Sequence, residues 1–474
     1  MGLKQEIRDI VRFRRILKEL AGLGFGYYIQ KSHLRRYLPF LHRIKISTPL
    51  ENEDALQAVR IRESLERLGP TFVKLGQLLS LRPDLIPEAY CKEFSKLQDH
   101  VPAVAFCEIR NVIEEDLGKP LEKIFKSFKP EPLAAASIAQ VHEATLYDGT
   151  KVAVKVQRPH IKETIDADLD ILFTIAQAVE DHVTGARNFR PVEVVKEFAL
   201  WTRRELDFQI EAHNAARLRD AMKEKRGLYV PSIYPAYSSR HVLTMEYVRG
   251  VKMDDTTALA LYKVNISQMV MTYFTSILEQ ALGHGFFHAD PHPANIFVRK
   301  DGTLVYLDFG IMGELSEDDR HKVIHFISSL ADKDENKSFG IIVSLAKSTD
   351  HADLASFKEE ALPLLRDVYS HSIGERSAGK VLYSVIALGA RKGILFDPNH
   401  ILMAKAIYQA EGLAVRLDPK FKIAAGLEKF ANEYVRKNYS PVNIAKRLQK
   451  TAFAHRDLLL DLPEHIVKII ERFL

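Results

Sequence analysis

The chain has only two cysteines, Cys91 and Cys107, among its 474 residues. A framework of disulfide bonds is therefore not expected, and this low cysteine content is typical of proteins in the reducing cytosol. Long apolar runs are lacking too, because none reaches the roughly 18 residues of a membrane-spanning helix. The N-terminus also lacks the pattern of a signal peptide. Together these absences predict a cytoplasmic protein.

Internal repeats and low-complexity segments are absent as well, whereas 46% hydrophobic and 27% charged residues are typical of a folded protein. The length requires more than one packed unit. The pattern is helical in residues 1–128. It is β-prone in residues 129–250, with a helical region from about 160 to 225, and helical again in 251–474 apart from one hairpin. The sequence therefore predicts an α+β fold in three parts.

Positive charge is concentrated at the N-terminus. Residues 1–45 contain 11 Lys or Arg against three acids, a balance of +8, so the rest of this chain of net charge +5 carries about −3. Apolar residues recur among them at helical spacing, at Ile7, Ile10, Val11, Ile16, Leu17 and Leu20. Such a basic amphipathic helix either lies on an anionic membrane surface or belongs to a folded domain and turns its basic face to water.

The most informative segment is His-Ala-Asp-Pro-His-Pro-Ala-Asn at 288–295, followed by Leu-Asp-Phe-Gly at 307–310. It supplies an acid, Asp290, then an amide, Asn295, and then a second acid, Asp308. Phosphoryl-transfer sites of the kinase type use this order of groups to orient a nucleophile and to hold magnesium on a nucleotide.

A hairpin is predicted to bring two of these groups together. Asp301 and Gly302 stand between two β-prone runs, and an Asp-Gly pair in that position is a strong hairpin signal. With these as the two central turn residues, Asn295 lies directly opposite Asp308. Opposed Cβ atoms are roughly 4.5–5.5 Å apart, close enough for the amide and the carboxylate to share a cation. The alternative is that both residues only cap the ends of the hairpin.

A second hairpin is predicted around Asp-Gly at 148–149, and its second strand carries Lys155 among apolar or small residues. A buried lysine needs an anionic partner, because an isolated ammonium is costly to desolvate. Nucleotide phosphates are one candidate partner. A carboxylate of the following helical region is another, and Glu205, Asp207 and Glu211 are available there. The alternative is an edge strand from which the lysine reaches solvent.

Alanine occurs where a glycine-rich loop would precede this hairpin, in Leu-Ala-Ala-Ala-Ser-Ile at 133–138. Alanine lacks the freedom of glycine at positive φ, so this backbone cannot cover phosphates in the same range of conformations. Ser137 offers a hydroxyl or a backbone amide to a phosphate, although close packing alone also explains such a stretch.

In the N-terminal part, Lys74 and Gln77 share one face of a helix that begins after Gly69-Pro70. Gly76 inside this helix costs about 1 kcal/mol relative to alanine, which indicates that another group approaches closely there. From residue types alone, a solvated Lys/Gln face is the better interpretation.

In order and combination these motifs resemble the UbiB family, the atypical kinase-like proteins tied to isoprenoid quinone (coenzyme Q) biosynthesis in bacteria, mitochondria and plastids. The resemblance runs from about residue 20 to beyond residue 430. It rests on Lys-Leu-Gly-Gln at 74–77 as the K-x-G-Q motif, Ala-Ala-Ala-Ser at 134–137 as the alanine-rich loop, Lys155, and Glu-Leu-Asp at 205–207 as the E-x-D motif.

The resemblance implies a bilobal protein-kinase-like fold. Residues 1–128 form a helical extension that carries K-x-G-Q, residues 129–250 a small β-rich N-lobe, and residues 251–474 a helical C-lobe. Two departures from related sequences stand out. No Ala-Pro-Glu follows Asp308 at the distance of a peptide-binding activation segment, and this sequence does not include the pair of C-terminal membrane helices found in many bacterial members, so the resemblance alone does not imply membrane anchoring.

The resemblance also assigns roles to single residues. Lys155 is expected to contact ATP phosphates and to pair with Glu211. Asp290 is expected to act as the catalytic base, with Asn295 and Asp308 on Mg²⁺. The alanine-rich loop and the interlobe hinge are expected to contact the nucleotide through Ala135, Ala136, Ser137, Glu246 and Val248. The extension is expected to cover the site through contacts among Lys74, Gln77, Glu205 and Asp207.

The implied activity is a Mg²⁺-dependent ATPase or a small-molecule or lipid kinase that supports quinone biosynthesis. Its expected partners are ATP, a quinone-precursor-like lipid and quinone-biosynthesis proteins, with no nucleic acid. A peripheral position at the inner face of the membrane, through the basic N-terminal helix, is the alternative to a purely cytoplasmic one. Other readings are an ATP-sensing scaffold, an aminoglycoside- or choline-type phosphotransferase, whose catalytic loop residues 288–295 also resemble, and a Ser/Thr protein kinase.

Overall fold

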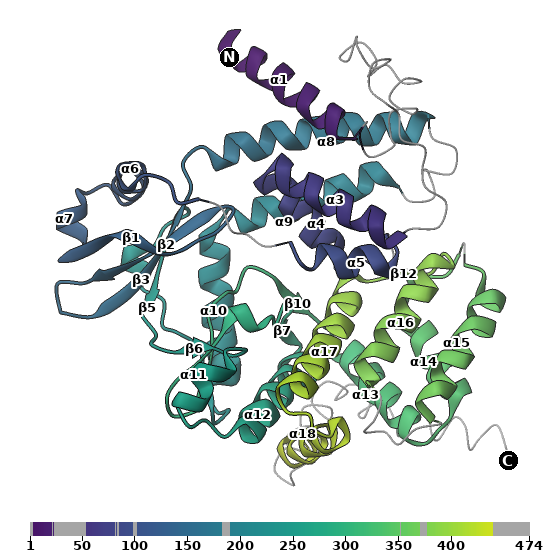
Figure 1. Cartoon of the computed structure of the whole chain (residues 1–474). Helices are drawn as coiled ribbons and strands as arrows, with labels where there is room; N and C mark the ends of the chain where they lie inside the picture. Colours follow the sequence, from purple (N-terminus) through teal and green to yellow (C-terminus); the bar gives the residue numbers. More distant parts are fainter. Residues whose placement is uncertain are drawn as a thin grey trace, which may run out of the picture.

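The computed structural model describes residues 3–20, 22, 54–80, 82, 85–97, 102–182, 190–350, 352–369 and 377–438. Its helices and strands form a strand-rich unit, a group of helices that includes the N-terminal one, and a larger helical unit toward the C-terminus (Figure 1). None of the described helices is both long and apolar enough to cross a membrane.

Four antiparallel strands form the first sheet, in the order β1 (Ser127–Ala135), β2 (Ala139–Thr145), β3 (Lys151–Gln157) and β5 (Val242–Glu246). Alternation along β3 turns Val152, Val154 and Val156 to one face, where they are fully buried against helix α6 (Phe106–Leu117). Lys155, between two of these valines, therefore points to the opposite face. The short helix α7 (Leu121–Ile124) leads from α6 into β1.

One apolar core joins the N-terminal helices to helices that come after β3. The members are α1 (Leu3–Leu20), α3 (Asp54–Leu68), α4 (Pro70–Ser80), α5 (Glu88–Phe94), α8 (Ile161–His182) and α9 (Pro191–Glu205). Helix α10 (Phe208–Met222) begins in this core beside β5 and runs away from the first sheet toward α12 (Ile266–Leu278) (Figure 1). The helical region predicted between 160 and 225 is thus three helices, because Arg190 has a φ of 45° before Pro191 and Asp207 caps α10.

Helix α1 packs against the rest of the protein through its apolar side chains. Phe13, Ile16 and Leu17 are buried in the core described above. The Arg12 guanidinium donates to both carboxylate oxygens of the buried Asp168, at 2.7 and 2.9 Å. The basic helix is therefore a domain helix over these residues, whereas residues 23–53, which contain the rest of the basic segment, lie outside the described residues.

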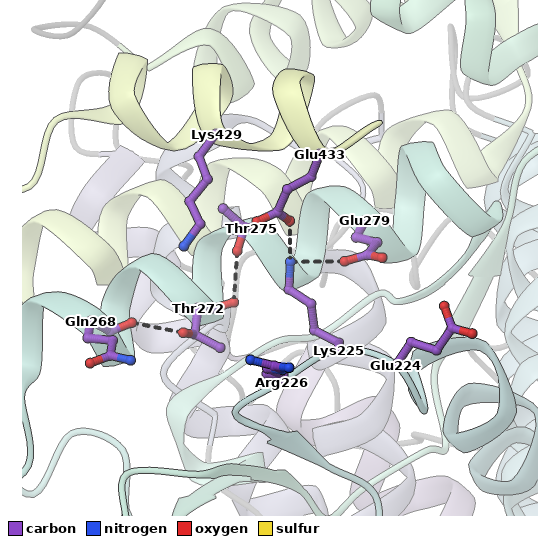
Figure 2. A pocket seen from close by; sticks show the side chains of 9 residues that line it. All are labelled: Glu224, Lys225, Arg226, Gln268, Thr272, Thr275, Glu279, Lys429 and Glu433. Carbon is purple, nitrogen blue, oxygen red and sulfur yellow. Dashed lines mark hydrogen bonds and ion pairs between the residues drawn. The ribbon is translucent and has the colours of Figure 1, made fainter. Parts of the chain in front are cut away.

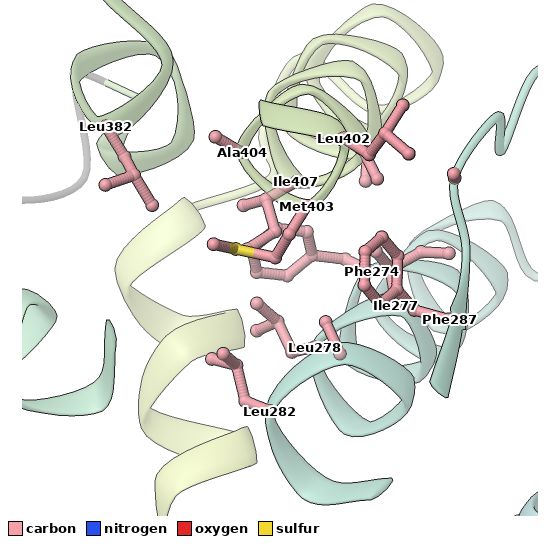
Figure 3. Packing of buried hydrophobic residues seen from close by; sticks show 14 of the residues in the cluster. Phe274, Ile277, Leu278, Leu282, Phe287, Leu382, Leu402, Met403, Ala404 and Ile407 are labelled. Atoms are coloured by element: carbon pink, nitrogen blue, oxygen red, sulfur yellow. The ribbon is translucent and has the colours of Figure 1, made fainter. Parts of the chain in front are cut away.

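The C-terminal helices share the largest core of the protein. They are α11 (Thr256–Leu261), α12 (Ile266–Leu278), α13 (Glu317–Ala331), α14 (Glu335–Ser344), α15 (Leu354–Tyr369), α16 (Ala378–Arg391), α17 (Pro398–Leu417) and α18 (Ile423–Asn438). Figure 3 shows its centre, where Phe274 and Leu278 of α12 meet Met403 and Ile407 of α17. A π-helix, Glu279–His284, continues α12.

Short strands interrupt these helices more often than the sequence predicts. The second sheet has the order β4 (Leu228–Tyr229), β9 (Leu304–Tyr306), β8 (Ile296–Val298) and β6 (Val251–Lys252). Two further pairs are β7 (Phe286–His288) with β10 (Met312–Glu314), and β11 (Ala346–Ser348) with β12 (Leu395–Phe396). The expectation of a single hairpin after residue 250 was therefore wrong, because strands of two or three residues carry little periodic signal.

The β8–β9 hairpin exists, but its predicted register was wrong by one residue. Ile296 pairs with Tyr306, so Asn295 faces Leu307, whose N–H donates to the Asn295 carbonyl at 3.0 Å. The loop holds three residues rather than two, because Gly302 takes a φ of 83° as its third residue. Gly149, with a φ of 90°, has the same place in the β2–β3 hairpin.

Gly76 provides a test of packing in α4. A Cβ built there lies 2.3 Å from Leu97 Cδ1 and 2.8 Å from Leu65 Cδ1, both in the core, so the predicted close approach is present. We expect Gly76→Ala to lower the free energy of unfolding by about 1–3 kcal/mol, because the overlap outweighs the gain in helix propensity.

Gly340 is the matched control, because it lies exposed in α14 with no atom within 4 Å of an added Cβ. Gly340→Ala should stabilise the protein by roughly 0.5–1 kcal/mol. Chemical denaturation of both variants measures the two effects, and a stabilising Gly76→Ala would contradict the packing.

Candidate nucleotide site

A buried ion pair between β3 and α10 is the centre of the site. The Lys155 ammonium donates to both carboxylate oxygens of Glu211 at 2.8 Å, so the contact predicted for Glu211 is present. Only 17% of the lysine side chain and 5% of the glutamate side chain are exposed. The lysine also lies 5.2 Å above the ring of Phe208, at the start of α10. This lysine is therefore not one that reaches solvent from an edge strand.

A second ion pair extends this cluster into the helical extension. Lys74 of α4 is buried, and its ammonium donates to Glu205 at the end of α9. Glu205 in turn lies beside Gly310, since a Cβ at that glycine would be 3.9 Å from Glu205 Cγ. The K-x-G-Q helix thus reaches the Asp-Phe-Gly segment through one carboxylate. The interpretation of Lys74 as part of a solvated face was wrong.

The other two residues assigned to this contact have further partners. Gln77 donates from its side-chain amide to the Leu97 carbonyl at 3.3 Å. Asp207 caps α10 by accepting from the Gln209 N–H at 3.1 Å, and it lies 3.6 Å from Arg240 Nε. Asp207 therefore fixes where α10 begins, and through that helix it sets the position of Glu211.

Asp308 is half-buried, and the charges of Lys155 and Lys74 both act on its carboxylate. Its Oδ1 accepts from the Gly310 N–H at 2.9 Å. The Phe309 carbonyl accepts from the Asn214 side chain at 2.9 Å, so α10 holds the Asp-Phe-Gly segment as well as the Lys155 partner. Phe309 itself is fully buried in the C-terminal core.

The ionisation of this cluster reflects an excess of negative charge. Burial works to lower the pKa of Lys155, but the charges of Glu211 and Asp308 outweigh it and raise that pKa. Burial raises the pKa of Glu211 against the opposing effect of Lys155. Burial also works to raise the pKa of Asp308, yet Lys155 and the Gly310 N–H keep it below its usual value. Counting Lys74 and Glu205, two cations face three carboxylates.

The 288–295 loop follows β7 beside this cluster. His288 is buried, its Nδ1 accepts from the Asp290 N–H at 3.2 Å, and its main-chain N–H donates to Gln280 at 3.1 Å. Burial lowers the pKa of His288, so the neutral imidazole is favoured. The Asn295 side-chain amide donates to the Asp290 carbonyl at 3.5 Å. This contact uses the side-chain nitrogen of Asn295 and not its side-chain oxygen.

The alanine-rich loop is a tight turn. Ala135 is the last residue of β1, and the Ala136 N–H donates to the Ala139 carbonyl at 2.8 Å. The Ala136 carbonyl accepts from Arg158 Nε, also at 2.8 Å. Ser137 is completely buried, and its hydroxyl has no hydrogen-bond partner within the described part of the chain. The Ser137 hydroxyl is therefore an unsatisfied donor that solvent does not reach.

The segment predicted as the hinge begins at the end of β5. Glu246 is the last residue of this strand, and its carboxylate lies among Tyr229, the Ser232 N–H and Arg299. Val248 lies in the segment between β5 and β6. The side chain of Glu246 thus joins the two sheets, and any contact of this residue with a base would come from its main chain.

The donor set fits a magnesium ion held partly by phosphates. Across the described residues, no group of three or more His, Cys, Asp or Glu side chains is arranged to hold a metal ion. Magnesium needs no such group, because it usually keeps several waters and binds one or two side chains together with phosphate oxygens. Asp308 and Asn295 could supply two oxygens of this kind. The excess negative charge nearby favours a bound cation.

A separate cavity of about 680 Å³ lies between the end of α10, α12 and α18 (Figure 2). At its centre the Lys225 ammonium is 2.9 Å from carboxylate oxygens of both Glu279 and Glu433. Positive and negative side chains balance along its walls, and none of the residues predicted for the nucleotide site lines it. This cavity is therefore not the candidate nucleotide site.

Sequence reasoning missed the residues that support the site. Asn214, His288 and Arg158 hold the Asp-Phe-Gly segment, Asp290 and the alanine-rich loop, respectively. His288 was part of the quoted motif, so its signal was available. The contacts of Asn214 and Arg158 join elements that are far apart in the chain, so no local sequence pattern predicts them.

Comparison with known proteins gives the family. Residues 96–341 match the ABC1 atypical kinase-like domain. An uncharacterized protein of Synechocystis is 34% identical over 427 residues, which cover 89% of this chain and 73% of that protein. The chain belongs to the UbiB family of ABC1 atypical kinase-like proteins.

Other members differ in length and in the names that they carry. A probable protein kinase UbiB of Marinobacter nauticus is 32% identical over 82% of this chain and 72% of its own length. The chloroplastic ACTIVITY OF BC1 COMPLEX KINASE 7 of Arabidopsis thaliana is 35% identical over 87% of this chain, which spans only 60% of that plant protein. The alignment thus covers most of the bacterial protein, whereas a large part of the plant protein lies outside it.

A solved structure supports the fold. The complex of Rv3197 with erythromycin, from Mycobacterium tuberculosis, superposes with a TM-score of 0.54 at 23% identity, covering 77% of this chain and 95% of that one. Together with the family, this likeness establishes a bilobal, kinase-like α+β fold.

The Lys155–Glu211 pair predicts a strong loss of stability when it is broken. We expect Lys155→Met to lower the free energy of unfolding by about 3 kcal/mol or more, because a buried carboxylate loses its partner. The double variant Lys155→Met, Glu211→Leu should recover most of this loss, since no charge is then left unpaired.

Urea denaturation of Lys155→Met, of Glu211→Leu and of the double variant gives the coupling energy between the two residues. Lys196→Met is the control, because the Lys196–Glu193 pair is more than half exposed on both sides and should contribute little. Additive losses in the double variant would show that Lys155 and Glu211 do not depend on each other.

Proposed function

We propose that the protein is a Mg²⁺-dependent, ATP-binding phosphotransferase or ATPase. The observation that carries this proposal is the bidentate Lys155–Glu211 pair, whose lysine also feels the charge of Asp308. Kinases need this lysine–glutamate pair and the aspartate of Asp-Phe-Gly in place together before a nucleotide is held productively. In this protein the lysine–glutamate pair is formed, and Asp308 acts on the same lysine.

Each residue has a defined task in this proposal. Lys155 binds ATP phosphates, and Asn295 and Asp308 hold Mg²⁺, which when bound neutralises charge on the phosphates. Asp290 accepts the proton of the attacking hydroxyl or water. His288 supports the aspartate because its ring nitrogen accepts from the Asp290 N–H. Main-chain groups of Glu246 and Val248 contact the adenine base of ATP.

A small molecule, a lipid or water is proposed as the phosphate acceptor rather than a protein. Helix α4 lies over the Asp-Phe-Gly side of the site through the Lys74–Glu205 pair, where a peptide would otherwise dock. Helix α13 begins at Glu317, soon after Gly310, which leaves little chain for a peptide-binding activation segment. Both features disfavour the Ser/Thr protein kinase reading.

Family membership supports a place in isoprenoid quinone biosynthesis. On this proposal the acceptor is chemically similar to a quinone precursor, and other proteins of that process are partners. The protein works in the cytoplasm or at the inner face of the membrane, with no role for nucleic acid. Because α1 buries Phe13, Ile16 and Leu17 in the protein, membrane contact would involve its exposed face, which includes Ile10 and Val11.

An ATP-sensing scaffold is the second candidate, and one observation favours it. The buried Lys74 joins the K-x-G-Q helix to Glu205, which lies beside Gly310, so nucleotide binding could be read out as a movement of α4. A scaffold does not need Asp290 as a base. The two candidates therefore differ in whether this carboxylate matters for output.

Replacing Asp290 separates the candidates. We expect Asp290→Asn to lower kcat for MgATP hydrolysis by about 100-fold or more, because the proton acceptor is lost, while the Kd for MgATP stays within about threefold. Steady-state kinetics and calorimetric titration measure the two quantities. Asp301→Asn at the tip of the β8–β9 hairpin is the control and should leave both unchanged.

Quinone production by a deletion strain provides the cellular readout. A strain complemented with Asp290→Asn should accumulate a quinone precursor if the enzyme reading holds. Normal quinone levels in that strain, with MgATP binding intact, would favour the scaffold.

A further inference from the structure

The cavity between the end of α10, α12 and α18 is used by none of the roles proposed above. Its volume of about 680 Å³ is typical of small-molecule sites. Every described side chain that lines it is polar or charged. Such walls favour a water-soluble ligand, because they offer no apolar side chain for an acyl chain to pack against.

One wall of the cavity is a polar stripe along α12. Gln268, Thr272 and Thr275 recur at helical spacing, and Glu279 follows at the same spacing, so the four side chains share one face. Other faces of α12 bury apolar side chains such as Phe274 in the C-terminal core. Glu279 is also the first residue of the π-helix, and π-helices frequently occur at functional sites. A helix of the main core therefore keeps one polar face for this cavity.

The carboxylates of the cavity gather around one buried cation. Only 11% of the Lys225 side chain is exposed, and its ammonium lies 2.9 Å from a carboxylate oxygen of Glu279 and from one of Glu433. The third carboxylate, of Glu224, points away from Arg226 in Figure 2. The negative charge thus lies mainly beside Lys225, and the other two cations of the cavity stand apart from it.

Arg226 reaches the cavity because the chain turns just after α10. A Cβ built at Gly227 would lie 3.3 Å from Thr272 Cγ2, so this turn packs directly on the polar stripe. The side chain of Arg226 is exposed, and it forms no ion pair with a described residue. Its guanidinium is therefore accessible to a ligand at the edge of the cavity.

Lys429 reaches the same cavity from α18. Gly426, one turn earlier, lets this helix pack on α12, because a Cβ there would overlap the ring of Phe274. Lys429 therefore lies on the face of α18 that is turned to α12, and Figure 2 shows its side chain extending in that direction. It too is exposed and has no ion pair within the part of the chain that the structure describes.

The donors of the cavity fit a phosphate group. The hydroxyls of Thr272 and Thr275 donate back to main-chain carbonyls of α12, at 2.9 and 2.8 Å. The donors that remain for a ligand are the Arg226 guanidinium, the Lys429 ammonium and the Gln268 side-chain amide. Guanidinium and ammonium groups are the usual partners of phosphate oxygens, and two of them match the charge of roughly −2 on a phosphate monoester.

We infer that this cavity binds a phosphate monoester of a small, water-soluble molecule, with the phosphate between Arg226 and Lys429. The rest of the ligand lies along the polar stripe of α12, where its hydroxyl groups can donate to carboxylate and threonine oxygens. The inference is independent of the proposed nucleotide site, because none of the residues assigned there lines this cavity.

Calorimetric titration with glycerol 3-phosphate, in a buffer with EDTA and without nucleotide, tests the site. We expect the wild-type protein to bind this probe. The double variant Arg226→Gln, Lys429→Gln should weaken binding about tenfold or more, because two charge-assisted contacts are lost. No binding by the wild-type protein would overturn the inference.

The matched control is the double variant Lys223→Gln, Lys422→Gln. It removes the same charge from exposed positions just after α10 and just before α18, outside the cavity. Its Kd for glycerol 3-phosphate should stay within about threefold of the wild-type value, since exposed charges at a distance are screened by salt. Equal weakening in the two double variants would contradict a specific site.

Two further arms distinguish other sources of the signal. Asp308→Asn should leave the affinity for glycerol 3-phosphate unchanged, and a large loss there would place the probe in the nucleotide site and overturn the inference. Vesicles that contain phosphatidic acid present the same monoester on a lipid. Binding to these vesicles through Arg226 and Lys429, with none of the soluble probe, would also overturn it.

Thermal unfolding provides a second measurement. Because both side chains are exposed, Arg226→Gln, Lys429→Gln should have the wild-type Tm when the probe is absent. Glycerol 3-phosphate should raise Tm in the wild-type protein and in the control, but not in this double variant. The single variants Arg226→Gln and Lys429→Gln repeat the comparison with one charge kept. A full wild-type rise in Tm in the double variant would overturn the inference.

Discussion

Lys155 and Glu211 connect the sheet of the N-lobe to helix α10, and much of the site is built outward from this contact. Burying an unpaired ammonium on this face of β3 would cost free energy. Helix α10 therefore has to place Glu211 within reach of Lys155. Asp207 begins that helix, and Asn214 on the same helix holds the Asp-Phe-Gly segment. One ion pair thereby couples the position of α10 to the position of Asp308.

The same electrostatic logic explains why the extension lies where it does. Lys74 brings a second cation to a cluster in which three carboxylates would otherwise face a single lysine. Gly76, on the same helix, lets α4 pack closely against Leu65 and Leu97. The Lys74–Glu205 pair therefore does two things: it holds α4 beside the Asp-Phe-Gly segment, and it adds a positive charge to the cluster. A nucleotide with a bound cation must fit into this arrangement or displace part of it.

The sequence predicted the fold and some contacts better than the details of the backbone. The order of Lys155, Asp290 and Asp308 indicated a kinase-like fold, and the expected Lys155–Glu211 contact is present. The opposition of Asn295 and Asp308 was wrong, because Asp-Gly fits two-residue and three-residue loops alike and only the backbone shows which one forms. Contacts such as Asn214 with Phe309 depend on packing between distant elements, which periodicity does not encode.

In the proposed function, a negatively charged cluster binds ATP through a divalent cation. The most direct test is calorimetric titration of the wild-type protein with ATP, once with excess Mg²⁺ and once with EDTA. We predict that removal of Mg²⁺ weakens ATP binding by about tenfold or more, because Asp308 and its neighbours then repel the phosphates. Equal affinity under the two conditions would contradict the account.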